Sequence, residues 1–140
     1  MKEERILKWI EKNNLTLVES CDNEWYIEES IITFNKRMAP RKQLYSVLHE
    51  CGHYLIFNSS SYKKLYKAQI LARTDKRKRS LEWRINFLKE EFDAWQRGKQ
   101  LARDLKIDIN EKDYDKYASE CLKTYCMWVV DKEWRKWDCV

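Results

Sequence analysis

The sequence has very few residues that break helices. Of its 140 residues, two are glycine and one is proline. Barrels and sandwiches built from many short strands need frequent tight turns, and such turns draw heavily on these residue types. The scarcity therefore argues against those folds and favours long helices. At this length we expect one domain, residues 1–140, with one hydrophobic core.

Paired cysteines and long apolar runs are also lacking. The five cysteines are odd in number and form no C-x-x-C pair, so we expect reduced thiols rather than a disulfide framework. The first residues lack the apolar run of a signal peptide, and no apolar stretch has the length of a membrane span. We therefore expect a soluble, cytoplasmic protein. The net charge of +5 is mild and does not require a nucleic-acid partner.

Histidine occurs only twice, and both copies belong to one short motif. The motif is His49-Glu50-Cys51-Gly52-His53, which has the form H-E-x-x-H. On a helix the two histidines share one face, while Glu50 projects about 100° further round. Two imidazoles on one face can hold a metal ion, and Zn²⁺ with three protein ligands keeps an activated water whose proton Glu50 is placed to accept. The alternative is two ordinary histidines on a packed helix.

A third metal ligand is expected from a long helix that the sequence predicts from Leu81 to Lys106. At about 100° per residue, Glu91 falls at the centre of the apolar face of this helix, and Glu90 and Asp93 fall away from it. A buried carboxylate is costly unless it is paired, protonated or bound to a metal. Glu91 is therefore the candidate ligand. The alternative is an internal salt bridge with Arg84, two turns earlier on the same face.

The remaining pattern predicts an α+β architecture in which a small sheet packs on the metal-binding helix and long helices follow. The expected elements are a helix from Glu3 to Lys12, strands at Leu15–Val18, Trp25–Ile27 and Ile31–Phe34, a helix beginning near Pro40, and a last helix capped by Asn110 and ending near Asp131. Strands joined by short connections favour an antiparallel sheet of about three strands. Gly52 lowers helix propensity by about 1 kcal/mol, which indicates that another backbone approaches it, with the last strand as the expected neighbour.

Three further features each allow a structural and a functional interpretation. Cys51 faces away from the histidines and is expected to be a buried, inert thiol rather than a ligand. The basic run from Arg73 to Arg79, which follows a short helical piece at Tyr62–Leu71, could contact phosphates but is more typical of a solvated or mobile loop. The amphipathic tail from Glu133 to Trp137 is expected to dock on its own domain rather than on a partner or a membrane. Nucleic acid is therefore not the expected partner.

The order of these elements resembles that of the ImmA/IrrE-type zinc metallopeptidases. The resemblance covers roughly the first hundred residues: a short N-terminal helix, a small sheet ending at Ile31 to Asn35, and the segment from Leu44 to Leu55 with its H-E-C-G-H core. In that family the third metal ligand is a glutamate that opens an E-x-x-A motif on a later helix. The segment from Glu91 to Ala94, with the sequence E-F-D-A, fits that motif.

The resemblance implies a zincin-like fold and a specific division of roles. It makes His49, His53 and Glu91 zinc ligands and Glu50 the general base. It also makes the strand from Ile31 to Asn35 the sheet edge along which an extended peptide could lie. Some members of the family cut transcriptional repressors, so the resemblance implies a regulatory protein as substrate.

Two classes of function follow from these observations. The first is a zinc-dependent endopeptidase, which needs an additional donor for the oxyanion. The candidate donors are tyrosines among which spacing does not choose: Tyr62, Tyr66, Tyr114, Tyr117 and Tyr125. The second is a domain with a structural or relict zinc site that binds a protein or nucleic acid through its basic run or tail. A structural zinc site normally has four protein ligands, and no cysteine lies at helical spacing on the histidine face, which favours the first class.

Overall fold

The computed structural model describes residues 1–21, 25–26, 30–60 and 80–131. Within these ranges the chain forms α1 (Glu4–Lys12), β1 (Thr16–Ser20), β2 (Trp25–Tyr26), β3 (Ile31–Asn35), α2 (Pro40–Phe57), α5 (Leu81–Asp104) and α6 (Glu111–Val130). The expected α+β class is confirmed, and so is the order of the helices and strands that fall within these ranges. None of the described helices is both long and apolar enough to cross a membrane.

The starts and ends of the long helices have local causes in the sequence. The Ser80 hydroxyl caps α5 by accepting from the Trp83 amide, and the Asn110 side chain caps α6 by accepting from the Asp113 amide. The α5 helix ends at Asp104, slightly before the predicted end, because Lys106 has a left-handed backbone with φ of 56°. The sequence alone therefore locates these helices to within a turn.

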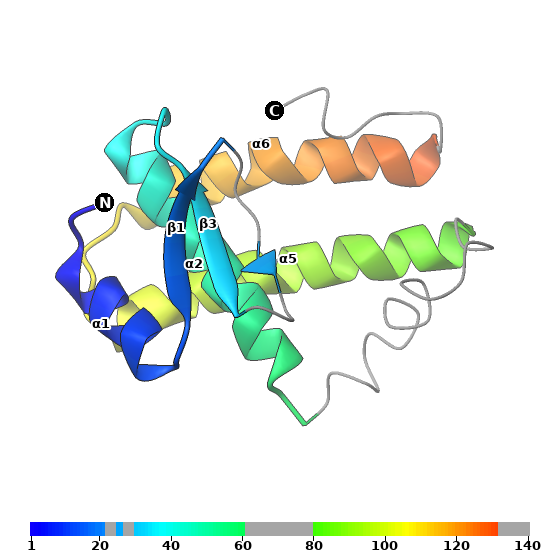
Figure 1. The fold of residues 1–140 in the computed structure, drawn as a ribbon. Helices are drawn as coiled ribbons and strands as arrows, with labels where there is room; N and C mark the ends of the chain where they lie inside the picture. The colour runs from blue at the N-terminus through cyan, green and yellow to red at the C-terminus, as the bar shows by residue number, and fades with distance from the viewer. Residues whose placement is uncertain (22–24, 27–29, 61–79, 132–140) are drawn as a thin grey trace.

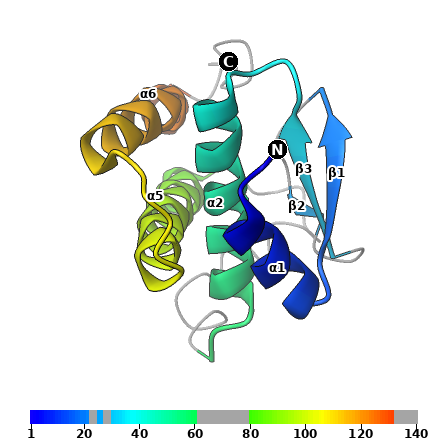
Figure 2. The same cartoon turned by 90° about the vertical axis from the view of Figure 1, so that its left-hand side faces the viewer.

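The α2 helix is the centre of the molecule. It lies between the sheet on one side and the pair α5 and α6 on the other, with α1 beside it (Figures 1 and 2). Its buried side includes Val47, Leu48 and Cys51, which are fully inaccessible and pack in one core with Ile6 and Ile32. Cys51 is thus the buried thiol that the sequence predicts.

The sheet differs from the predicted antiparallel arrangement. Its strand order is β1-β3-β2, with β1 parallel to β3 and β2 antiparallel to β3. The prediction was a wholly antiparallel sheet, but β3 carries the buried residues Ile32, Thr33 and Phe34 and takes the central position. The β2 segment runs back on the far side of β3, so β1 and β3 point the same way.

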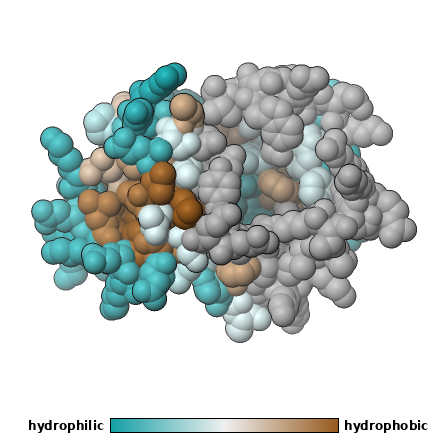
Figure 3. Space-filling view, viewed as in Figure 1, coloured by the Kyte–Doolittle hydropathy of each residue, from teal (hydrophilic) through white to brown (hydrophobic). Residues whose placement is uncertain are grey.

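This order also corrects the expectation that Ile31–Asn35 is a sheet edge. The strand has a neighbour on each side, since Leu17 and Trp25 both pair with Ile32. Seen from the sheet side, an apolar area lies over the strands and is bordered by hydrophilic residues (Figure 3). Val18 of β1 is among the exposed apolar side chains. On the β2 side, the strand pairing covers only Ile31 and Ile32 of β3.

The close neighbour of Gly52 is α5 and not the last strand. A Cβ atom on Gly52 would lie 2.0 Å from the carbonyl oxygen of Ala94, and one on Gly98 would lie 2.5 Å from that of Leu48. The two glycines thus let α2 and α5 cross with their backbones in contact. The crossing places the turn that contains His49 and His53 against the part of α5 that precedes Ala94.

Substitution of Gly52 by Ala tests this crossing. Helix propensity alone would make the variant about 1 kcal/mol more stable. The new methyl group would instead overlap a backbone oxygen, so we expect a loss of about 3 kcal/mol or more. Urea unfolding of both proteins measures the difference, and a variant as stable as the wild type would contradict the crossing.

Three predicted features fall in parts of the chain that the structure does not describe. They are the short helical piece at Tyr62–Leu71, the basic run from Arg73 to Arg79, and the tail from Glu133 to Trp137. The expectations for them remain predictions.

Candidate metal centre

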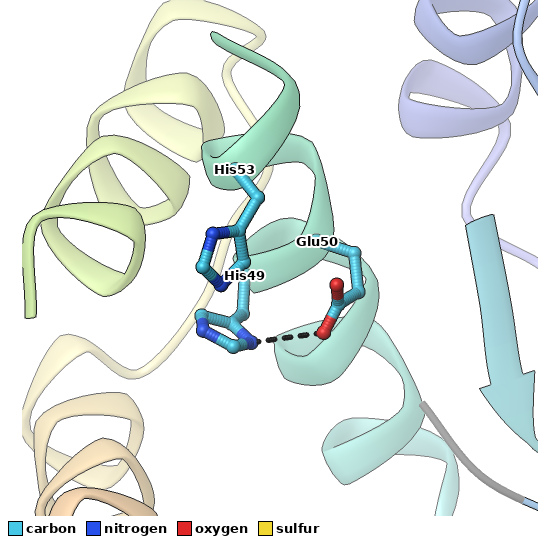
Figure 4. A group of neighbouring side chains, drawn as sticks. All are labelled: His49, Glu50 and His53. Atoms are coloured by element: carbon cyan, nitrogen blue, oxygen red, sulfur yellow. Dashed lines mark ion pairs between the residues drawn. The ribbon is translucent and has the colours of Figure 1, made fainter. Parts of the chain in front are cut away.

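The two histidines lie one above the other on the same side of α2. Their ring centroids are 4.7 Å apart, and Figure 4 shows Glu50 projecting from a different side of the helix. One ligand atom from each of His49, Glu50 and His53 lies within 4.8 Å of the others. This group is close enough to hold a metal ion.

The carboxylate of Glu91 reaches both histidines from α5. Its Oε2 lies 2.9 Å from Nε2 of His49, and its Oε1 lies 3.2 Å from Nε2 of His53. Two ligand atoms bound to one tetrahedral zinc ion are about 3.3 Å apart, because each lies 2.0–2.1 Å from the metal. Both distances between Glu91 and the histidines are therefore close to the spacing of two ligand atoms on one zinc ion.

The other acidic and basic residues near this part of α5 have different contacts. Arg84, the alternative partner of Glu91, donates from Nε to the carbonyl oxygen of Val129 at 3.0 Å. Asp93 forms a partly exposed ion pair with Arg97 at 3.3 Å. Both oxygens of Glu91 contact histidines, so its surroundings match the ligand interpretation better than the salt-bridge alternative.

Glu90 belongs to the same cluster, which sequence reasoning missed. It is 7% exposed, and its Oε1 lies 3.7 Å from Nδ1 of His53. Helical phase placed Glu90 away from the apolar face of α5, but the close crossing lets α2 cover that side too. A carboxylate beside Nδ1 favours the tautomer that leaves Nε2 free for a metal. The signal in the sequence was the pair of adjacent glutamates.

Glu50 occupies the corresponding place beside His49. Its Oε1 lies 3.1 Å from Nδ1 of His49, and the residue is 5% exposed. Each histidine thus has one carboxylate on its Nδ1 side, while both Nε2 atoms face Glu91. The contact of Glu50 with His49 is thus on the Nδ1 side of the ring, whereas Glu91 contacts Nε2.

The buried carboxylates of the cluster favour positive charge on the two histidines. Burial lowers the pKa of His49, but the carboxylates of Glu50 and Glu91 outweigh it and raise that pKa overall. Burial likewise lowers the pKa of His53, which Glu91 and Glu90 raise well above its usual value. The two imidazolium charges in turn hold the pKa of Glu91 far below normal despite its burial. A divalent cation would supply the same two charges as these two protons.

An aromatic side chain holds the plane of the His49 ring. Trp95 of α5 stacks on it with 4.2 Å between centroids and 13° between planes. The backbone carbonyl of Trp95 in turn accepts a hydrogen bond of 2.7 Å from the Tyr114 hydroxyl. The sequence identified Trp95 only as part of an apolar face. Its position one turn after Glu91 was the available signal for a role at the site.

The hydroxyl groups of the candidate tyrosines have different contacts in the structure. Tyr62 and Tyr66 are not among the residues it describes. The Tyr114 hydroxyl donates a hydrogen bond to the Trp95 carbonyl oxygen, and the Tyr117 hydroxyl lies 3.3 Å from the Ser46 hydroxyl. The Tyr125 hydroxyl makes a hydrogen bond with Glu91. Of the described candidates, Tyr125 is thus the one that contacts the proposed ligand set.

Comparison with known proteins does not identify a family. No family model matches the chain, and neither the curated proteins nor the solved structures contain a match to it.

Proposed function

We propose that the protein is a zinc-dependent metallopeptidase of zincin-like architecture. In this proposal His49, His53 and Glu91 bind zinc, and Glu50 is the general base. The observation that carries the proposal is the convergence of both Nε2 atoms on the two oxygens of Glu91, at 2.9 and 3.2 Å, beside a buried Glu50.

The donor set supports a catalytic site more than a purely structural one. Structural zinc sites normally have four protein ligands, often thiolates. Of the described cysteines, Cys51 lies in the core, and none belongs to the closely spaced group of metal-binding side chains. Two histidines and one glutamate leave a fourth position, which in catalytic zinc sites holds water.

The side chains of the cluster can each take part in peptide hydrolysis. Zinc, when bound, polarises the scissile carbonyl group and lowers the pKa of a bound water. Glu50 accepts the proton of the attacking water and returns it to the leaving amine as the carbon–nitrogen bond breaks. Glu90 and the stacked Trp95 keep His53 and His49 in place, which limits reorganisation during the reaction.

The substrate is proposed to be a peptide segment of a regulatory protein. The support is the resemblance of the H-E-C-G-H and E-F-D-A segments to the ImmA/IrrE-type peptidases, some of which cut transcriptional repressors. A cytoplasmic location fits this role, and the four described cysteines are all free thiols.

The alternative is a non-catalytic domain in which zinc ties α2 to α5 and the protein acts by binding a partner. The observation in its favour is burial. Side-chain exposure is 12% for His49 and 13% for His53, and 7–8% for Glu50 and Glu91. Both functions need the metal, but only the peptidase needs the base.

The test of the proposal starts with the metal. Purified protein is expected to bind about one zinc per chain and to release protons on binding, because ligand imidazoles must be neutral. The raised pKa values of both histidines mean that protons compete with zinc at higher pH than for free imidazole, so affinity should fall steadily as the pH is lowered. Calorimetric titration in two buffers of different ionisation enthalpy measures both quantities.

Activity is tested on a mixture of random decapeptides, with products identified by mass spectrometry. The peptidase proposal predicts cleavage that a chelator stops and added zinc restores. Failure to bind any divalent transition metal would remove both functions. Zinc binding without cleavage in the mixture would favour the binding domain.

A further inference from the structure

The α6 helix is held against the metal centre at both ends. Near its start, the Asp113 carboxylate accepts a hydrogen bond of 2.9 Å from the Tyr45 hydroxyl of α2. Near its end, the Trp128 ring packs edge-to-face on Trp83 and Phe87 of α5, at 5.4 and 5.5 Å. The segment between these contacts therefore has a defined position beside α2 and α5.

Tyr125 lies in this segment and points to the site. Its ring stacks on Phe87 with 5.7 Å between centroids and 21° between planes. Phe87 precedes Glu91 by one turn of α5, and the Tyr125 hydroxyl donates a hydrogen bond to the Glu91 carboxylate. The same hydroxyl is close enough to Glu50 to feel its charge.

The phenol of Tyr125 is a neutral donor. A tyrosine hydroxyl has an ordinary pKa of about 10. The hydroxyl therefore keeps its proton at neutral pH. It contacts the third candidate ligand, Glu91, and is near enough to the candidate base, Glu50, for their charges to interact.

We propose that Tyr125 is a catalytic residue that donates a hydrogen bond to the oxyanion of the scissile peptide group. The inference rests on the proposed peptidase function. When water adds to the carbonyl carbon, the carbonyl electrons move onto its oxygen and the water proton moves to Glu50. The Tyr125 hydroxyl turns from Glu91 to that oxygen and donates without losing its proton. When the carbon–nitrogen bond breaks, the carbonyl re-forms and the proton passes from Glu50 to the amine.

The other described candidates have different positions. The Tyr114 hydroxyl donates to the Trp95 carbonyl inside the core. Tyr117 lies two turns before Tyr125 on α6, and its hydroxyl contacts Ser46. Tyr117 is therefore a matched control, being a phenol on the same helix outside the proposed machinery.

The variant Tyr125→Phe keeps the ring on Phe87 and removes only the hydroxyl. We expect its zinc affinity to stay within about twofold of wild type and its kcat to fall by about 10²-fold, the effect of losing one oxyanion donor, with KM little changed. Affinity for N-phosphoryl-leucinamide, whose tetrahedral phosphoryl group imitates the reacting carbon, should fall by a similar factor. Tyr117→Phe should match the wild type in every measurement.

Three results would overturn the assignment. An unchanged kcat in Tyr125→Phe would exclude the donor role. A fall in zinc affinity that accounts for the loss of rate would make Tyr125 a residue that only positions Glu91. A wild type that binds zinc but neither cuts peptides nor binds the phosphoryl compound would remove the peptidase function and the Tyr125 role together. If only the Tyr125 inference fails, the result differs from failure of the peptidase function. In that case the wild type would still cut peptides and the Glu50→Gln variant would not.

Discussion

Replacement of Glu50 by Gln is expected to leave zinc bound while peptide hydrolysis falls by about 10²-fold or more, the usual contribution of a general base. The side chain keeps its shape, and its amide oxygen can still accept from Nδ1 of His49, which lies 3.1 Å from the present carboxylate. His49 should therefore keep its orientation and its affinity for the metal. What the variant loses is the group that takes the proton from water.

The measurement pairs elemental analysis with kcat/KM on a peptide from the decapeptide mixture. Asp93→Asn is the matched control, because Asp93 is an acid on α5 whose partner is Arg97 at the surface. It should retain wild-type activity. If Glu50→Gln cuts the peptide at the wild-type rate with zinc bound, the mechanism is wrong and the base must be another group.

The second large effect is expected for Glu91→Ala. This change removes both carboxylate oxygens that lie within 3.2 Å of the histidine Nε2 atoms. Loss of an outer partner of a metal ligand typically costs 10–100-fold in affinity, and loss of a ligand should exceed that. We expect zinc affinity and hydrolysis to fall together.

Two neighbouring acids on α5 provide graded controls for this variant. Glu90→Ala should weaken zinc by about 10-fold, the lower end of the range for an outer partner, because its carboxylate supports Nδ1 of His53 and does not face the metal position. Asp93→Ala should leave zinc binding unchanged. Competition titrations with a chromophoric chelator rank the three variants. A larger loss in Glu90→Ala than in Glu91→Ala would identify Glu90 as the ligand.

The stability of Glu91→Ala in the presence of chelator should depend on pH. A raised histidine pKa stabilises the fold fully below the unfolded value near 6.5, and the contribution disappears as the pH rises through the folded value. Glu91 is a main cause of that rise. The pKa of Glu91 itself is lowered in the folded protein. The stability that this lowering contributes is lost only in acid, below the pKa of Glu91 in the unfolded chain. The melting temperature of the variant should therefore be lower than that of the wild type at pH 6. The difference between the two melting temperatures should become smaller toward pH 9.

The sequence by itself determined the features that depend on one helix at a time. Ser80 and Asn110 begin helices because their side chains cap the first backbone amides, whatever packs outside. The two histidines share a face because the helical repeat is a local property. The same repeat put Glu91 at the centre of the α5 apolar face, where the structure finds it against His49 and His53.

The sheet and the neighbour of Gly52 were decided by tertiary structure. Strand order depends on which strand is buried by the helices, and spacing along the chain does not contain that information. The pattern predicted an antiparallel sheet, and the family resemblance made Ile31–Asn35 its edge, whereas β3 lies between β1 and β2 and is parallel to β1. A glycine inside a helix, Gly52, predicted that another backbone lies close to it. Only the packed structure shows that this backbone is that of Ala94 in α5.

The surroundings of the candidate centre also came only from tertiary structure. Three side chains contact the histidines or Glu91: Glu90, Trp95 and Tyr125. These contacts depend on the heights at which α2, α5 and α6 pack against one another, measured along the helix axes. Those heights are fixed by contacts across elements, such as Gly98 against the Leu48 carbonyl and Trp128 against Phe87. A helical pattern gives the angle of a side chain around its own axis, but its distance to another helix depends on how the two surfaces pack.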